Sequence, residues 1–574
     1  TSLSLVYRPC VSISVPGREN HHTHNPLGIK EGKRALFTSR VPRAGKAAGS
    51  RRTHRRVRRE RGSMRASISS AVAAAGLVAL EFRSCDGLSV GTDHACVLLD
   101  DASVKCFGMN DYGQLGQGDT DARGQSADTM GDNLEPVDLG TGAVVIAMDA
   151  GSDHTCVILD TGDVKCFGKN DKGQLGLGDT ANRGESASEM GNDLPAVDLG
   201  AGRTAVAVSA EGEYTCVILD NGQVRCWGDG EFGSLGNGSE ENTGDGSGVV
   251  SDSVNLGGSD LVTAIGEGPC AIFESGDMKC WGKGYYGKNG QGTPDNLGDG
   301  PDEMGDALPT VPLGTGRLPH SVSGGRDYNC VVLQDGGVKC WGRADGGQLG
   351  TENIATLGDD PSEMGDDLPT VELGTGETAV EVSAGSQHTC AVLSTGGVKC
   401  WGRGFFGNLG LESFRAMGHF PNTMGDDLPY VNLGAGLSAL TVKAGGERTC
   451  AVLDNGSLKC WGGNSGGQLG LGDVDPRGLA AGQMGDDLPA VNLGTGRTAV
   501  ALARAGLPSV APSVAPPGAP TSASTSAPTA SSTAGDLRRS NSTPSPAGSS
   551  SSDSTTPSPT AAVEPAEGGG SSSD

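Results

Sequence analysis

The chain has 574 residues, of which 96 are glycine and only 4% are aromatic. This glycine content excludes a mainly helical protein, because each glycine inside a helix costs about 1 kcal/mol relative to alanine. Tight turns between strands use glycine readily. The chain has a net charge of −26. Residues 1–81 contain 16 Lys/Arg and 4 Asp/Glu and so contribute +12, which leaves a net charge of −38 on residues 82–574. Such an acidic body excludes nucleic acid as its partner, and it either attracts basic partners or keeps the protein soluble.

The first segment, residues 1–63, is basic and contains a run of arginines from Arg51 to Arg59. It predicts a disordered leader, or a gene-model extension ahead of a start at Met64. The run also fits a nuclear localisation signal.

Residues 64–85 have the pattern of a secretory signal. Met64-Arg65 precede an apolar stretch of about fifteen residues from Ala66 to Leu80. That length is short for a membrane span and suits the hydrophobic region of a signal peptide. We therefore expect a signal peptide with cleavage near Phe82–Cys85 and no membrane span. An organelle transit peptide is the alternative.

From residue 86 to 504 the chain repeats itself. Paired cysteines recur with first members 60, 60, 54, 60, 60 and 60 residues apart. Around Cys156, two runs of strand-forming residues flank the turn-forming stretch Asp160–Asp163, which predicts a hairpin. Val197–Leu199 and Ala205–Val208 are two further strand predictions in the same unit. Four short strands in about sixty residues predict one blade, and seven such units predict an all-β, closed seven-bladed β-propeller.

A glycine-rich motif follows each hairpin. Asn110–Asp119, Asn170–Asp179 and Asn464–Asp473 read Asn-x-x-Gly-Gln-Leu-Gly-x-Gly-Asp, which resembles the signature of regulator of chromosome condensation (RCC1) repeats. The resemblance covers about residues 86–504 and implies a seven-bladed propeller. The resemblance implies less about function, because members of this family differ in what they do. The nuclear founding member docks on chromatin and is an exchange factor for the GTPase Ran. Other members are secreted β-lactamase inhibitors or parts of ubiquitin ligases. No inserted wedge stands out here, and the paired cysteines depart from the nuclear pattern.

Each cysteine pair has nine residues between its members. A turn centred on Thr161 places Cys156 opposite Cys166, within reach of a disulfide after a modest twist. Buried free thiols and two-thiolate zinc sites are the alternatives. Seven disulfides imply an oxidising compartment, which favours a secreted or extracellular protein over the organelle and nuclear alternatives. The candidates are Cys96, Cys106, Cys156, Cys166, Cys216, Cys226, Cys270, Cys280, Cys330, Cys340, Cys390, Cys400, Cys450 and Cys460.

An aromatic residue follows the second cysteine of every pair, and all five tryptophans of the chain occupy this position. A large flat side chain once per blade predicts packing between blades, with ligand stacking as the alternative. The residues are Phe107, Phe167, Trp227, Trp281, Trp341, Trp401 and Trp461.

The end of the repeat region predicts ring closure. Thr498–Leu502 resembles the strand that elsewhere leads into the next blade, so we expect it to pair with the first blade near Asp93–Cys96 and remove the open sheet edges. Residues 505–574 are rich in Ser, Thr and Pro, which predicts a disordered, O-glycosylated tail.

No catalytic set, cofactor motif or metal site stands out in the sequence. His94, His154 and His388 alternate with other residue types in equivalent positions, which suits a strand surface. The recurrent Met-Gly-Asp-Asp-Leu-Pro segments are the preferred functional loops, as a calcium site or as turns whose aspartates bond their own backbone.

Loop aromatics at Tyr285-Tyr286, Phe405-Phe406 and Phe414 either anchor a partner or pack between blades. We predict a non-enzymatic, monomeric propeller scaffold that binds a protein partner. The alternative is a guanine-nucleotide exchange factor for a Ran-type GTPase, and an enzyme that uses the central channel is the least favoured class.

Overall fold

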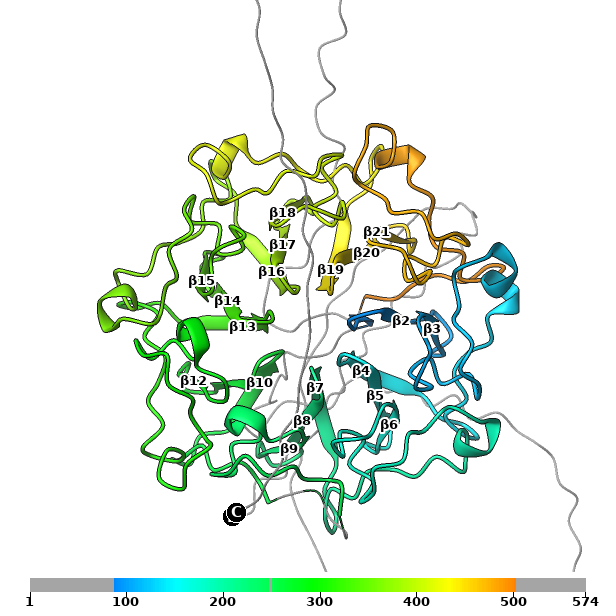
Figure 1. Cartoon of the computed structure of the whole chain (residues 1–574), viewed down its shortest axis with the longest axis horizontal. Coiled ribbons are helices and arrows are strands. Elements are labelled where there is room, and N and C mark those ends of the chain that lie inside the picture. Colours follow the sequence, from blue (N-terminus) through cyan, green and yellow to red (C-terminus); the bar gives the residue numbers. More distant parts are fainter. Residues whose placement is uncertain (1–86, 247–249, 251, 502–574) are drawn as a thin grey trace, which may run out of the picture. The chain divides into compact units, whose positions relative to one another are not determined.

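The computed structural model describes residues 87–246, 250 and 252–501, all of them in the larger of the two compact units of the chain. They form seven separate three-stranded antiparallel sheets arranged in a ring (Figure 1). We call each sheet a blade. Within a blade the first strand lies nearest the ring centre and the following hairpin lies further out (Figure 1). The predicted leader, signal peptide and tail lie outside the described residues.

The first three blades have these strands: β1 (Leu88–Val90), β2 (His94–Leu98) and β3 (Val104–Gly108); β4 (Val145–Ala150), β5 (His154–Leu159) and β6 (Val164–Gly168); β7 (Ala205–Glu211), β8 (Tyr214–Leu219) and β9 (Val224–Gly228). Blades 4 and 5 have β10 (Val262–Gly266), β11 (Cys270–Phe273) and β12 (Met278–Cys280); β13 (Pro319–Gly324), β14 (Tyr328–Leu333) and β15 (Val338–Gly342). Blades 6 and 7 have β16 (Ala379–Ala384), β17 (His388–Leu393) and β18 (Val398–Gly402); β19 (Ala439–Gly445), β20 (Arg448–Leu453) and β21 (Leu458–Gly462).

The helices of the described residues are short 3-10 turns in the loops between blades. They are η1 (Ala127–Thr129), η2 (Gly131–Asn133), η3 (Ala187–Glu189), η4 (Glu231–Gly233), η5 (Tyr285–Gly287), η6 (Pro361–Glu363), η7 (Gly425–Asp427) and η8 (Gly485–Asp487). Within the described ranges, none is long and apolar enough to cross a membrane.

The seven-bladed propeller predicted from the sequence is confirmed, but the blades have three strands instead of four. Val197–Leu199 is not a strand, and the segment predicted as Ala205–Val208 is the inner strand of the next blade. Val197 makes a single backbone hydrogen bond of 2.8 Å to Val164 O, without a continuing ladder. In the preceding repeat, the carbonyl of Leu139 accepts a hydrogen bond from the ammonium group of Lys165. A side chain thus occupies an acceptor that a fourth strand would need.

The hydrophobic core is divided among the interfaces between blades. The described residues form seven clusters of buried side chains, and each cluster joins side chains from two neighbouring sheets. The cluster that closes the ring joins Val452 and Leu458 of blade 7 to Val97 and Phe107 of blade 1. A single blade is too thin to bury both of its faces, so blades are stable only when stacked.

Both ends of the described chain contribute to the inner strand of blade 1. Val90 and Leu88 of β1 pair with Ala95 and Val97, while Ala499 pairs with Leu99. The register therefore differs from the predicted pairing near Asp93–Cys96, because β1 already occupies that part of β2. The ring is nevertheless closed, because β1 and the segment at Ala499 both pair with the middle strand of blade 1. Neither segment is left as an unpaired strand at this blade.

Candidate protein-binding surface

The cysteines are joined within each hairpin. All seven predicted pairs are disulfides between directly opposed residues of the middle and outer strands, with Cα–Cα distances of 4.0–4.1 Å. The sulfur-bearing side chains are buried between neighbouring blades. No cysteine in the described part of the chain is a free thiol. The disulfide-rich propeller is therefore compatible with an extracellular location.

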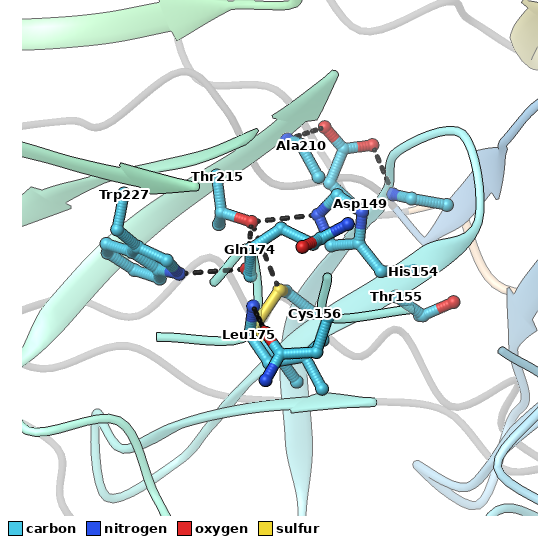
Figure 2. Close-up of a disulfide and its surroundings, with 12 residues drawn as sticks. Asp149, His154, Thr155, Cys156, Gln174, Leu175, Ala210, Thr215 and Trp227 are labelled. Carbon is cyan, nitrogen blue, oxygen red and sulfur yellow. Dashed lines mark hydrogen bonds between the residues drawn. A yellow bond between two sulfur atoms is a disulfide. The ribbon is translucent and has the colours of Figure 1, made fainter. Parts of the chain in front are cut away.

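The recurring motif residues around each disulfide connect adjacent blades. Figure 2 shows the junction of blades 2 and 3 beside Cys156. The carbonyl of Gln174 accepts hydrogen bonds from Trp227 Nε1 at 2.9 Å and from Thr215 Oγ1 at 3.0 Å. Asp149 accepts a bond of 2.9 Å from the backbone amide of Ala210 (Figure 2). These polar groups are hydrogen-bonded to one another inside the protein, so they are not available to an external ligand.

The seven aromatic residues that follow the second cysteines are all buried, with at most 1% of each side chain exposed. Each lies against the second glycine of the Gly-x-x-Gly motif in the preceding blade. A Cβ atom at Gly350 would come within 2.9 Å of Trp401 Nε1, and the φ angle of this glycine is +68°. Glycine is required there both by the backbone conformation and by the close approach of the indole. These contacts place the aromatic ring between blades, away from solvent.

The three histidines lie in the blade interfaces instead of on the strand surface suggested by the sequence. His154 Nε2 lies 2.8 Å from Thr215 Oγ1, and His94 and His388 make the equivalent contact to Thr155 and Thr449 at 2.9 Å. At the equivalent positions Arg448 and Tyr328 also reach the next blade, through bonds to backbone carbonyls. Tyr214 instead donates to Glu211 of its own blade.

Burial lowers the pKa of His154 to about 3, with a smaller contribution from Lys169, and lowers the pKa of His388 to about 4. The unfolded chain protonates near 6.5, so it binds more protons than the folded state between that value and about 3. Stability is therefore unaffected above pH 6.5 and falls as the pH drops below it. At pH 5.5 each such histidine is expected to cost about 1.4 kcal/mol.

We expect His154→Gln to reduce the loss of thermal stability between pH 7.5 and pH 5.5 relative to the wild type. Melting temperatures at the two pH values test this. Tyr328→Phe is the matched control, because it removes an interblade bond that does not titrate in this range. The control is expected to lower stability equally at both pH values, and an equal pH response of all three proteins would contradict the assignment.

The Met-Gly-Asp-Asp-Leu-Pro segments hold neighbouring blades together. Lys399 Nζ donates hydrogen bonds of 2.8 Å to the carbonyls of Leu373 and Gly425. Asp426 accepts bonds of 2.7 Å from both the backbone amide and the hydroxyl of Thr375. Equivalent bonds occur at Asp132 and Asp366. The first aspartate thus bonds a turn of the preceding repeat. That the aspartate directly before Leu-Pro bonds its own backbone stays a prediction. The described residues contain no group of three or more side chains suited to a metal ion.

One face of the ring carries the turns between inner and middle strands together with the loops that follow the outer strands. Backbone bonds join the two sets, such as Arg403 N to Gln387 O at 2.9 Å. We call this the turn face. At its centre a cavity of about 380 Å³ is lined mainly by glycine-rich turns from all seven blades. Glu211 lines it and accepts hydrogen bonds from Tyr214 and Lys288 at 2.6 and 3.0 Å.

Large aromatic side chains are exposed on the turn face at the two residues that precede the motif glycine. The exposed fractions are 53% and 43% for Tyr285 and Tyr286, and 59% and 42% for Phe405 and Phe406. Phe232 lies beside Tyr285, with ring centroids 5.8 Å apart in an edge-on arrangement. We call these five residues the aromatic arc; it spans blades 3, 4 and 6. Phe414, in the loop after β18, is 68% exposed.

A chain of alternating charges crosses the arc from blade 4 to blade 6. Lys283 contacts Asp327 at 2.7 Å, and Arg343 bridges Asp327 and Asp345 at 3.2 and 2.8 Å. Arg403 also contacts Asp345, at 3.0 Å. The cations lie over the aromatic rings, for example Arg343 at 5.3 Å from the centroid of Tyr286. The sequence predicted the exposed aromatic residues but not this network of charges. A Lys or Arg two residues after several of the buried aromatic residues could have indicated it.

Comparisons with known proteins agree with this architecture. Two family models described as "Regulator of chromosome condensation (RCC1) repeat" match the chain, one at residues 86–114, 145–174, 205–234, 379–408 and 441–468, the other at 102–158 and 335–392. The ultraviolet-B receptor UVR8 of Arabidopsis thaliana is 27% identical over 67% of this chain and 78% of its own length. The secretion-regulating guanine nucleotide exchange factor of Bos taurus is 26% identical over 65% of this chain and 76% of its own length.

Among solved structures, Kap60 bound to yeast RCC1 (Prp20) is similar, with a TM-score of 0.49 and 16% identity over 75% of this chain and 91% of that chain. The family matches fall on six of the seven blades, and each includes the hairpin or the glycine motif described above. The chain therefore carries RCC1 repeats, and its described residues assemble the repeating unit into a seven-bladed propeller.

Proposed function

We propose that the protein is a non-enzymatic scaffold of an oxidising, extracellular compartment that binds a protein partner through the turn face. The observation that carries the proposal is the aromatic arc. Its four most exposed rings leave 42–59% of their surface in solvent although the recurring motif around them is buried. Aromatic and arginine side chains dominate the energetics of protein interfaces, and here they occur together at rigid loop positions.

The cations beside the aromatic arc are held in place by ion pairs before any partner binds. Arg343 and Arg403 share Asp345, and both lie within 6 Å of an aromatic ring centroid. Such pre-organisation lowers the entropy lost when side chains are fixed on association. The residues that recur in every repeat are buried and hold the blades together, whereas the loop residues that differ between blades are exposed and form the proposed binding surface.

The compartment is tested by counting thiols in protein purified without reductant from the cells that naturally make it. We expect that alkylation followed by peptide mapping finds none of the fourteen propeller cysteines free. Free thiols in protein taken from its native compartment would overturn the extracellular proposal. Acceleration of nucleotide release from a Ran-type GTPase would favour the exchange-factor function instead, which the name of the bovine relative suggests.

The binding surface is tested with the fourfold variant Tyr285→Ser, Tyr286→Ser, Phe405→Ser and Phe406→Ser. We expect it to lose capture of the extracellular protein that the wild type retains in crosslinking experiments, because the aromatic anchors are gone. The matched control is Val144→Ser, Leu318→Ser and Leu440→Ser, three apolar residues of similar exposure at the opposite ends of the inner strands. Equal capture by wild type and both variants would contradict the assignment to the turn face.

A further inference from the structure

A second cavity, of about 390 Å³, opens on the turn face where blades 6, 7 and 1 meet. One part of its wall is apolar and consists of Phe406, Val474 and Pro476. The other part carries two carboxylates, Asp93 and Glu447. A cavity lined by both apolar side chains and a pair of carboxylates suits a ligand that has a hydrocarbon stem and a positively charged end.

The buried arginine in the cavity wall forms only a long ion pair with Asp93. Arg448 is 1% exposed, and its two terminal nitrogens donate to the backbone carbonyls of Gly91, Thr92 and His94. Its nearest approach to Asp93 is 4.0 Å. Arg448 Nε has no hydrogen-bond partner among the described residues, and Arg448 forms part of the cavity lining.

The two carboxylates repel each other in the free protein. Partial burial, together with the negative charge of Asp93, raises the pKa of Glu447 above its ordinary value. No side chain of the described residues donates a hydrogen bond to Glu447. A cation placed between the two groups would relieve this repulsion, whereas an acidic ligand would increase it.

We propose that the cavity between blades 6, 7 and 1 receives a lysine or arginine side chain of the protein partner. The ammonium or guanidinium group lies between Asp93 and Glu447, and the alkyl stem packs on Phe406 and Val474. The net charge of −38 outside residues 1–81 attracts a basic segment toward the protein before it docks. The inference rests on the proposed protein-binding function and specifies the chemistry of the partner.

The probe is a fluorescein-labelled nonapeptide in which arginine alternates with glycine, together with the same peptide carrying neutral citrulline in place of arginine. Fluorescence anisotropy with the disulfide-bonded protein is expected to show binding of the arginine peptide only. We expect Glu447→Gln and Phe406→Ser each to weaken binding at least tenfold. The matched controls are Phe420→Ser, an exposed aromatic residue outside both the aromatic arc and the cavity, and Asp111→Asn, an exposed carboxylate of blade 1 that does not line the cavity.

Both controls should stay within twofold of the wild type. Equal weakening by Glu447→Gln and Asp111→Asn would show attraction to the acidic body alone and would overturn the pocket. Equal binding of the citrulline peptide would exclude recognition of a positive charge. If only the pocket proposal fails, the fourfold arc variant still loses the captured partner. If the proposed function fails, that variant retains the partner, so the two failures are distinguishable. Circular dichroism of each variant separates loss of binding from loss of fold.

Discussion

A chain that ends at residue 497 is expected to lose about 3–5 kcal/mol of folding free energy, whereas a chain that ends at Leu507 keeps the stability of the full protein. The deletion removes three backbone hydrogen bonds that close the ring, each worth about 1 kcal/mol. They are Asp100 N to Thr498 O at 3.0 Å, Val500 N to Leu98 O at 2.9 Å and Ala499 N to Gly456 O at 2.8 Å. It also exposes the core residues that Ala499 covers at the junction of blades 7 and 1.

Chemical denaturation of the two truncated proteins with intact disulfides measures this difference. The protein ending at Leu507 is the matched control, because it retains the closing segment and lacks only the Ser/Thr/Pro-rich tail. We also expect faster unfolding of the shorter protein, since blade 1 then lacks half of its inner strand. If the two proteins unfold at the same denaturant concentration, the pairing of Ala499 with Leu99 does not hold the ring closed.

Replacing Trp401 by alanine is expected to cost about 3–5 kcal/mol, whereas replacing it by phenylalanine is expected to cost about 1 kcal/mol. Trp401 is fully buried in the cluster that joins blades 5 and 6, so alanine leaves a cavity there. Phenylalanine keeps most of the volume and loses only the bond of 3.0 Å from Nε1 to the carbonyl of Gln348. That carbonyl retains a bond of 2.9 Å from Thr389 Oγ1, so it is not left without a donor.

Blades 1 and 2 already contain the conservative substitution, because Phe107 and Phe167 are fully buried at the equivalent position. Equilibrium unfolding monitored by far-UV circular dichroism gives the two free-energy changes independently of the tryptophan signal. A similar cost for both variants would mean that the indole hydrogen bond, and not the volume of the ring, accounts for most of the contribution.

Several features of the site were within reach of the sequence, and others were not. The exposed aromatics of blades 4 and 6 stand out because they replace polar residues in a repeating motif. The cavity beside Phe406 does not, because Asp93 and Glu447 are 354 residues apart in the sequence and meet only where the last blade joins the first. The strand count was overestimated because Val197 and Leu199 are strand-forming residues that pack inward without forming a ladder.

The sequence by itself determined the blade number, the pairing of the cysteines across each hairpin and the one aromatic residue per blade. These features depend on residues close together in the chain and recur with a fixed period, so spacing alone defines them. Only the tertiary structure decided the register of ring closure, the charge chain from Lys283 to Arg403 and the cavity at the junction of blades 6, 7 and 1. Each of these requires side chains from different repeats to meet, and that meeting depends on how the blades stack around the ring.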